Sequence, residues 1–289
     1  MGFVQKIVQK ELEEVSRVYL HSFAVVFITS DILMIDPHFK TFNGKFFSYH
    51  GECDLVLMRS DKFADGLGLL VHVRATRIDK PHASYSYISN AAVKIGRHVL
   101  EVFDDGQLLV NGERISDENG LSFSGFMLKK STKGTSNKIV AYELILGDKT
   151  IVIRSNTKTG IVFVDVDGYF ADSLGLLGSE QNQGLYSRDG MFDMTDNWNS
   201  FGEEWQVTSD EKMLFQEARY PQHPVGCAYT SKASSNLRQR RRLIDNTSGA
   251  SNDVATKACS SLTGKKTEFC ILDIVITGDI ELANDPFYK

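Results

Sequence analysis

The sequence predicts a mainly β protein, an antiparallel sandwich or barrel with an N-terminal helix and a small helical C-terminal extension. Between Leu67 and Phe170, short runs alternate apolar and polar side chains or are rich in β-branched and aromatic residues. Asp-Gly and Asn-Gly pairs separate several of these runs, which is typical of tight hairpins. Because no helical pattern lies between the runs, neighbouring strands are expected to pair with each other in a meander.

The composition indicates a soluble, folded protein and points to no particular function. The 289 residues suffice for one large β domain, or for one domain with a small appendage. The chain is 42% hydrophobic and contains 18 phenylalanines, which provide ample core volume. A net charge of −5 gives no general attraction to nucleic acid or to an anionic membrane.

Residues 1–35 combine a helical pattern with an apolar stretch. Apolar residues recur at helical spacing over 1–20, and the chain is mostly apolar over 18–35. Glutamates precede the apolar stretch and Asp31 interrupts it, unlike a signal peptide, and it is shorter than the roughly 20 apolar residues of a membrane span. We interpret 1–35 as an amphipathic helix and a first strand, or as an N-terminus that is not the natural one; an atypical signal or anchor is the alternative.

The stretch Asp36–Arg59 predicts a hairpin followed by a partly buried strand. Aromatic and polar residues alternate on both sides of Asn43-Gly44, a strong hairpin signal. Cys53 stands just before the apolar run Leu55–Met58. Further strands are expected in these runs: GLGLLVHVRATRI, YSYISNAAVKIG, HVLEVFDDGQLLVNGERI, KIVAYELIL, TIVIRSN and GIVFVDVDGYF.

The character of the chain changes after Leu174. A polar loop rich in Gly, Asn, Asp and Ser runs to Val207, and helical signs return over 210–218. Residues 228–252 are polar and rich in Ser and Arg, which predicts a linker. The tail, 253–289, is expected to form a helix and a second helical or extended segment joined by a short covalent clip.

Three motifs carry a resemblance to a known family. They are D-P-H-F-x-T-F-N-G…G-E-C-D-x-V-L from residue 36, G-L-x-G from residue 175, and F-G-x-x-W-x-V from residue 201. In this order they closely resemble a von Willebrand factor type D domain, and the resemblance covers 36–227. It implies a two-sheet β sandwich. The tail resembles an extension that accompanies some microbial type D proteins.

The resemblance also implies how the cysteines pair. Cys53 and Cys227 resemble the type D disulfide that links the first hairpin to the segment after F-G-x-x-W, while Leu177 replaces the family's G-L-C-G cysteine. Cys259 and Cys270 are close enough in sequence to clip one helix to the next segment. The alternative is four buried thiols in a cytosolic protein.

Catalysis by Cys53 is a weaker interpretation. His50 and Asp54 are near it in sequence, and thiolate enzymes pair Cys with His. Residues this close on a strand do not generally point at one reacting atom, and no glycine loop of the oxyanion type is recognisable. We therefore expect Cys53 to be structural.

Calcium is the cofactor that the resemblance raises. Type D domains commonly hold Ca²⁺ between the Asn or Asp of the T-F-N/D-G turn and a loop after G-L-x-G. The matching residues here are Asn43, Ser179 and Gln181, with carboxylates further along the loop at Asp189, Asp193 and Asp196. Hard cations prefer several oxygen ligands that include carboxylates. The alternative is a hydrogen-bonded turn and a solvated acidic loop.

The linker carries two candidate modification sites. Arg238, Arg240 and Arg241 belong to an R-x-R-R sequence, which subtilisin-like processing proteases recognise in secreted proteins. Asn246 begins the Asn-Thr-Ser sequon for N-glycosylation. A short basic run without interleaved aromatics is a weak signal for nucleic-acid binding.

The function expected from these features is non-enzymatic. The chain is interpreted as an extracellular-type interaction module that makes matrix, adhesive or assembly contacts with proteins, glycans or copies of itself. A lipid-associated accessory domain would instead carry a large exposed apolar patch. An enzyme of unrecognised type would have a deep pocket with convergent titratable residues.

The linker assignment predicts where proteases cut first. A polar Ser- and Arg-rich segment cannot bury enough apolar surface to order itself, so limited trypsin digestion should cleave first among Arg238–Arg242. Mass spectrometry of the early products should show a resistant N-terminal fragment that ends there. First cuts between Leu67 and Phe170 would contradict the proposed boundary.

Overall fold

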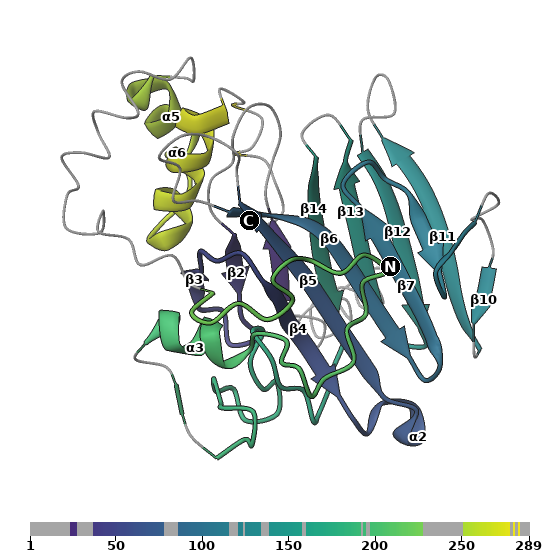
Figure 1. The fold of residues 1–289 in the computed structure, drawn as a ribbon. Helices are drawn as coiled ribbons and strands as arrows, with labels where there is room; N and C mark the ends of the chain where they lie inside the picture. The colour runs from purple at the N-terminus through teal and green to yellow at the C-terminus, as the bar shows by residue number, and fades with distance from the viewer. Residues whose placement is uncertain are drawn as a thin grey trace, which may run out of the picture.

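The protein folds as a two-sheet β sandwich with small helices at its periphery (Figure 1). The structure, a computed structural model, describes residues 24–27, 37–77, 86–115, 121–123, 125–133, 139–157, 160–191, 193–194, 197–227, 251–277, 280 and 283. The predicted helix over 1–20 lies outside these residues. Within 18–35, the described part is one strand.

The described strands form two antiparallel sheets. In spatial order, the first sheet contains β10 (Leu121–Phe123), β11 (Phe126–Lys133), β12 (Ile139–Leu146), β13 (Lys149–Asn156), β14 (Ile161–Asp167), β1 (Ala24–Phe27), β2 (His38–Lys40) and β3 (Phe46–Ser48). The second contains β4 (Asp54–Ser60), β5 (Leu69–Arg77), β6 (Ser86–Ile95), β7 (His98–Phe103), β8 (Leu108–Val110) and β9 (Glu113–Arg114). The second sheet is a sequential meander, as the sequence predicts.

Turn chemistry sets the hairpins of the second sheet. Gly106 has φ +80° between β7 and β8. Asn111 and Gly112, between β8 and β9, both have positive φ, 52° and 84°, which a two-residue type I′ turn requires. The Asp-Gly and Asn-Gly pairs therefore stand where the predicted hairpins are found.

The main core lies between the sheets. Along β5, Val71, Val73 and Ala75 alternate into this core, and valines of β14 and β6 join the same cluster. His72 and Arg74 alternate to the opposite, outer face of the second sheet. A face of a sheet with buried polar residues must be covered by another segment, because buried polar groups need hydrogen-bond partners.

Strand β4 is buried at every position except the partly exposed Arg59, more than the sequence suggests. Its free edge is closed by two segments: Leu174 exchanges backbone hydrogen bonds with Arg59, and the N–H of Val56 donates to the carbonyl of Trp205 at 2.8 Å. The two segments carry the G-L-x-G and F-G-x-x-W motifs. These motifs thus seal the edge strand that would otherwise expose unpaired backbone groups.

A short helix, α3 (Trp198–Glu204), fixes the second of these segments. The side chain of Asn197 caps it by accepting from the N–H of Ser200. A Cβ at Gly202 would come within 2.1 Å of the Tyr49 ring, so only glycine lets the helix approach. The described helices also include α2 (Phe63–Gly66), α5 (Asn252–Ala258) and α6 (Lys265–Thr277).

The C-terminal helices form a clipped pair beside the first sheet. A disulfide joins Cys259 to Cys270, as the spacing suggests. From α6, Phe269 stacks on His38 at 4.1 Å between centroids and meets Phe46 edge-on at 6.0 Å. The pair is therefore docked by aromatic contacts on β2 and β3. None of the described helices is long and apolar enough to cross a membrane.

Several elements differ from the sequence interpretation. Residues 210–218, expected to be helical, form an irregular segment across the second sheet, because Leu214 and Phe215 are adjacent and both buried on it. The helix α3 lies inside the loop predicted for 174–207. The hairpin β10–β11 was not predicted, since lysines interrupt the apolar pattern of β11.

The two disulfides should contribute unequally to stability. The pair Cys53–Cys227 spans 174 residues and Cys259–Cys270 spans 11. Chain entropy assigns them about 5 and about 3 kcal/mol, since a longer loop restricts the unfolded chain more. Calorimetry of C53A/C227A should therefore show the larger loss in Tm, and C259A/C270A the smaller one. Equal losses would contradict this assignment.

Candidate functional site

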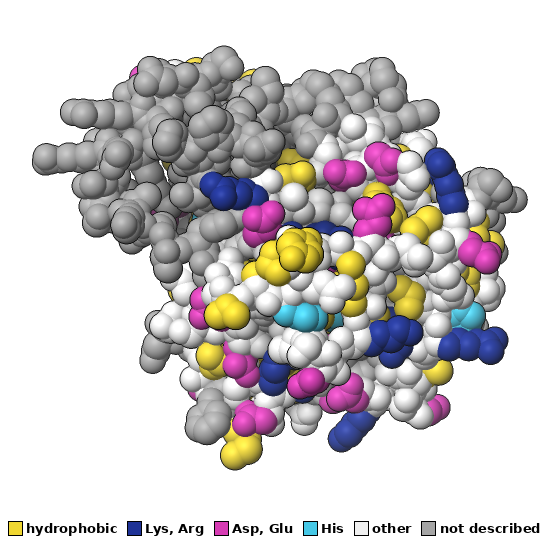
Figure 2. Space-filling view, in the orientation of Figure 1, with side chains coloured by type: hydrophobic (Ala, Val, Ile, Leu, Met, Phe, Trp, Pro, Cys, Tyr) yellow, Lys and Arg dark blue, Asp and Glu magenta, His cyan; other side chains and the backbone are white. Residues whose placement is uncertain are grey.

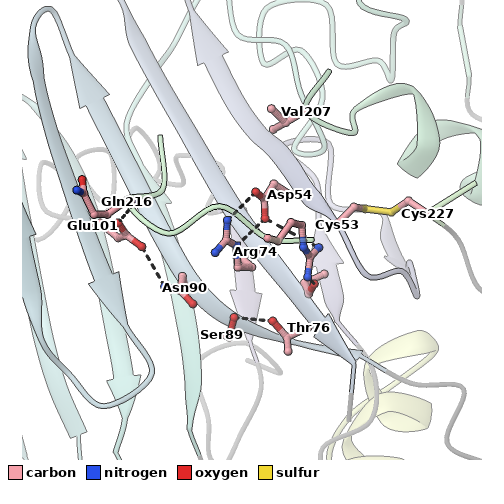
Figure 3. Close-up of polar contacts among 12 residues, drawn as sticks. Cys53, Asp54, Arg74, Thr76, Ser89, Asn90, Glu101, Val207, Gln216 and Cys227 are labelled. Atoms are coloured by element: carbon pink, nitrogen blue, oxygen red, sulfur yellow. Dashed lines mark hydrogen bonds and ion pairs between the residues drawn. A yellow bond between two sulfur atoms is a disulfide. The ribbon is translucent and has the colours of Figure 1, made fainter. Parts of the chain in front are cut away.

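The outer face of the second sheet is covered by one long segment, which we call the strap (residues 208–226). Both of its ends are fixed at the start of β4: the N–H of Val207 donates to the carbonyl of Asp54 at 2.8 Å, and Cys227 forms the disulfide with Cys53 (Figure 3). In Figure 1 the strap crosses the strands from β4 towards β7 and returns. Its turning region reaches β7, where the N–H of Gln216 donates to Glu101 at 2.8 Å.

A buried ion pair lies beneath the strap. The guanidinium of Arg74 donates twice to the carboxylate of Asp54, at 2.8 and 2.9 Å (Figure 3). Both side chains are buried, and such a pair needs this two-point geometry to offset its desolvation. From the strap, Arg219 donates to the carbonyl of Ala75 at 2.9 Å and approaches Asp54 at 4.0 Å. These contacts tie the returning limb of the strap, residues 219–226, to β4 and β5.

Glu101 is the second buried acid of this face. Its carboxylate accepts from the side-chain amide of Asn90 at 3.0 Å and from the backbone of Gln216 (Figure 3). Burial raises the pKa of Glu101 above its ordinary value, against the lowering effect of these hydrogen bonds. Glu101 therefore serves as the acceptor that positions the strap.

A small apolar cluster, separate from the main core, holds the outgoing limb of the strap, residues 208–218. Leu214 and Phe215 pack on Ala92, with Leu70 and Val99 beside them. The guanidinium of Arg74 lies 4.4 Å from the Phe215 ring centroid, a cation–π arrangement. Apolar contact here is limited to a few side chains.

His72 lies in the middle of the covered face. It is fully buried, and neither ring nitrogen has a hydrogen-bond partner. Burial lowers the pKa of His72 to about 4, although Glu211 and Asp54 favour the charged form. The imidazole is therefore neutral at pH 7 in the closed structure.

The segment that leads into the strap is fixed around Trp205. The indole is fully buried, donates to the carbonyl of Tyr186 at 3.1 Å, and has the guanidinium groups of Arg59 and Arg188 at 5.4 and 5.3 Å from its ring. Arg188 also binds the carboxylate of Glu211 on the strap. The conspicuous tryptophan of the motif is therefore a structural anchor.

The predicted calcium ligands are only partly brought together. Asn43 does meet the loop after G-L-x-G, but its amide N–H donates to the carbonyl of Gln183 at 2.7 Å while its oxygen accepts from Thr41. Ser179 is buried and pairs with Gly184 through its backbone, and Gln181 lies in the exposed turn that follows. Asn43 thus faces the loop with a hydrogen-bond donor, where a cation needs oxygen.

The carboxylates expected for this site lie in a different turn. Asp189 accepts from the hydroxyl of Ser187 and the N–H of Met191, which lowers its pKa, and Asp193 pairs with Tyr186. Asp196 lies outside the described residues. Within the described part of the chain, no three Asp, Glu, His or Cys side chains are grouped as a metal ion requires. The described members of this donor set therefore do not form a calcium site.

Of the other candidate residues from the sequence, one lies in the described part of the chain and four lie outside it. Cys53 is in a disulfide and has no thiol with which to act as a nucleophile. Arg238, Arg240, Arg241 and Asn246 lie outside the described residues, so processing and glycosylation stay predictions. Sequence reasoning missed the face under the strap, although polar residues inside the apolar runs of β5 and β7 signal a second covered face.

Large apolar side chains are exposed at a few described positions: Leu67, Met127, Tyr169, Met191, Tyr220, Val225, Val254 and Ile280. Tyr220 and Val225 are the two most exposed, at 100% and 102%, and they share the returning limb of the strap. On the face shown in Figure 2, acidic, basic and apolar side chains are interspersed. The strap is therefore the described segment with the most concentrated apolar exposure.

Comparison with known families agrees with this architecture. The family described as the von Willebrand factor type D domain matches residues 33–185, from a few residues before β2 to the loop after β14. The protein therefore belongs to the von Willebrand factor type D domain family. Membership suggests an adhesive or assembly module of the extracellular kind, and the two disulfides are consistent with an oxidising compartment.

Calcium should not stabilise the fold. A bound ligand raises Tm by mass action only if the folded chain assembles its site, and Asn43 presents a donor to the loop. Thermal melting in chelator and in millimolar calcium should give the same Tm. N43A, which loses the bond to Gln183, should cost about 1 kcal/mol in either buffer. A calcium-dependent rise in Tm that N43A abolishes would contradict this.

Proposed function

We propose that this protein is a non-catalytic, extracellular interaction module that makes matrix, adhesive or assembly contacts with other proteins or glycans. Family membership supports a binding role, because type D domains are generally interaction modules. The disulfide-closed sandwich supports work outside the cell, where such bonds persist. The fold alone places few limits on the class of ligand, because one fold can serve many functions.

The observation that carries the proposal is the anchored apolar loop of the strap. Tyr220 and Val225 are fully exposed, yet the residues on either side of them are fixed: Arg219, only 9% of whose side chain is exposed, bonds to Ala75 on β5, and the buried Cys227 is joined to Cys53. Between the anchors, His223 bonds to the carbonyl of Val207 at 2.9 Å.

Pro224 adds a further tie, since its carbonyl accepts from Gln206 at 3.0 Å. A tyrosine on a loop held in this way loses little entropy on binding, which is a property of interface hot spots. The loop is therefore the surface we assign to partner contact.

Binding should depend on this loop. The purified chain, secreted from an expression host, is immobilised and tested against a panel of matrix proteins and a glycan array, with and without calcium. We expect saturable, calcium-independent binding to at least one of them. Y220S/V225S should weaken it tenfold or more, because each apolar side chain removed from a buried interface costs about 1 kcal/mol or more.

The matched control is M191S, which removes an exposed apolar side chain from another loop. It should bind as the unaltered chain does, and all three proteins should share one Tm. The absence of saturable binding would overturn the proposed function. Binding that survives Y220S/V225S would instead overturn the assignment of the surface.

A further inference from the structure

The strap is fixed at both ends, and its outgoing limb, residues 208–218, lies between them. The ends are joined to Cys53, which precedes β4, and to Asp54, the first residue of β4. The outgoing limb is held by the small cluster of Leu214 and Phe215, by the bond from Gln216 to Glu101, by the ion pair of Glu211 with Arg188, and by the cation–π contact of Phe215 with Arg74. Such a limb can lift from the sheet without breaking the sandwich, because its contacts are separate from the main core.

The burial of His72 under this limb is energetically unfavourable. It is buried in the closed structure, and neither of its ring nitrogens is hydrogen-bonded. A buried polar group without a partner carries a desolvation penalty that water relieves on opening. When the limb lifts, water can therefore form the hydrogen bonds that the imidazole lacks in the closed structure.

Charged groups act on His72 from several elements: Asp54 on β4, Lys94 on β6, Arg188 before the strap and Glu211 on it. Arg74 on β5, Glu101 on β7 and Arg219 on the strap belong to the same covered face. The carboxylates are already engaged. Asp54 is bound by Arg74, Glu211 by Arg188, and Glu101 by Asn90 and Gln216. A protonated imidazole would thus be a buried cation without its own acceptor, beside the guanidinium of Arg74.

We propose that residues 208–218 are an acid-opened lid over the apolar face formed by Leu70, Ala92 and Val99, with His72 as the group that releases it. In the open form the imidazole is solvated and can take a proton, whereas the closed form excludes that proton. Acid therefore draws the equilibrium towards the open lid while the disulfide Cys53–Cys227 keeps the strap attached. This device does not depend on the proposed function.

The pH window follows from the two pKa values of His72. The value is about 4 in the closed form and 6.5 in its ordinary, solvated state. The preference for closure is complete above pH 6.5 and is lost as pH falls towards 4. Because one pKa unit corresponds to tenfold, the opening constant should rise about 30-fold between pH 7.5 and pH 5.

Amide hydrogen exchange of the whole chain tests the lid. Exchange of the Gln216 amide, corrected for the intrinsic pH dependence, should report an opening constant about 30-fold larger at pH 5 than at pH 7.5. Amides of β13 and β14 provide the internal reference and should not change. Equal opening of the limb at both pH values would overturn the proposal.

Two variants assign the response to His72. H72F and H72L both remove the titrating group, and near-UV circular dichroism at pH 7.5 selects the one that keeps the native packing. The selected variant should retain at most a few-fold response. The control H38F alters a histidine on β2 of the first sheet, where it bonds to Ser48 and stacks on Phe269 of α6, and should keep the full response.

Glu211 has a lowered pKa and could add its own acid sensitivity through the Arg188 pair, so E211Q separates that share. The lid with His72 as its trigger predicts that E211Q keeps most of the 30-fold change. A full response in the selected His72 variant, or its loss in E211Q alone, would overturn the role of His72.

Discussion

Strand β4 imposes the constraint on which the rest of the structure depends. It is the edge of the second sheet, yet it is buried, so its outward N–H and C=O groups must all find partners. The segments at Leu174–Leu177 and Trp205–Val207 supply them, and both come from the chain beyond the last strand. The polar region after β14 is therefore as much a part of the sandwich as the strands.

The same constraint explains the glycines and aromatics of the motifs. A Cβ at Gly175 would lie 2.5 Å from the carbonyl oxygen of Leu57, so no other residue lets that segment reach the edge of β4. Gly202 has the same role against Tyr49. Trp205 then locks the second segment through its hydrogen bond and its two arginines. These residues serve the closure of the edge rather than chemistry.

The strap follows from this closure. After Val207 the chain moves away from the start of β4, and at Cys227 it is joined there again. A loop with both ends fixed at Cys53 and Asp54 must cross the outer face, and the buried polar residues of that face meet it there. The strap therefore both covers the outer face of the sheet and exposes apolar side chains to solvent. The outgoing limb covers His72 and the acids, while the returning limb presents Tyr220 and Val225 to solvent.

The sequence by itself determined the class of fold, the meander of the second sheet and the family, because turn dipeptides, strand alternation and the motif spacing are local signals. It also indicated the four cysteines as two pairs. Only the tertiary structure decided which way Asn43 presents its amide, that residues 210–218 form an irregular segment over a sheet, and that His72 is buried without a partner. These features depend on segments more than 100 residues apart, such as Asn43 with Gln183 and Glu101 with Gln216, and no local pattern encodes such contacts.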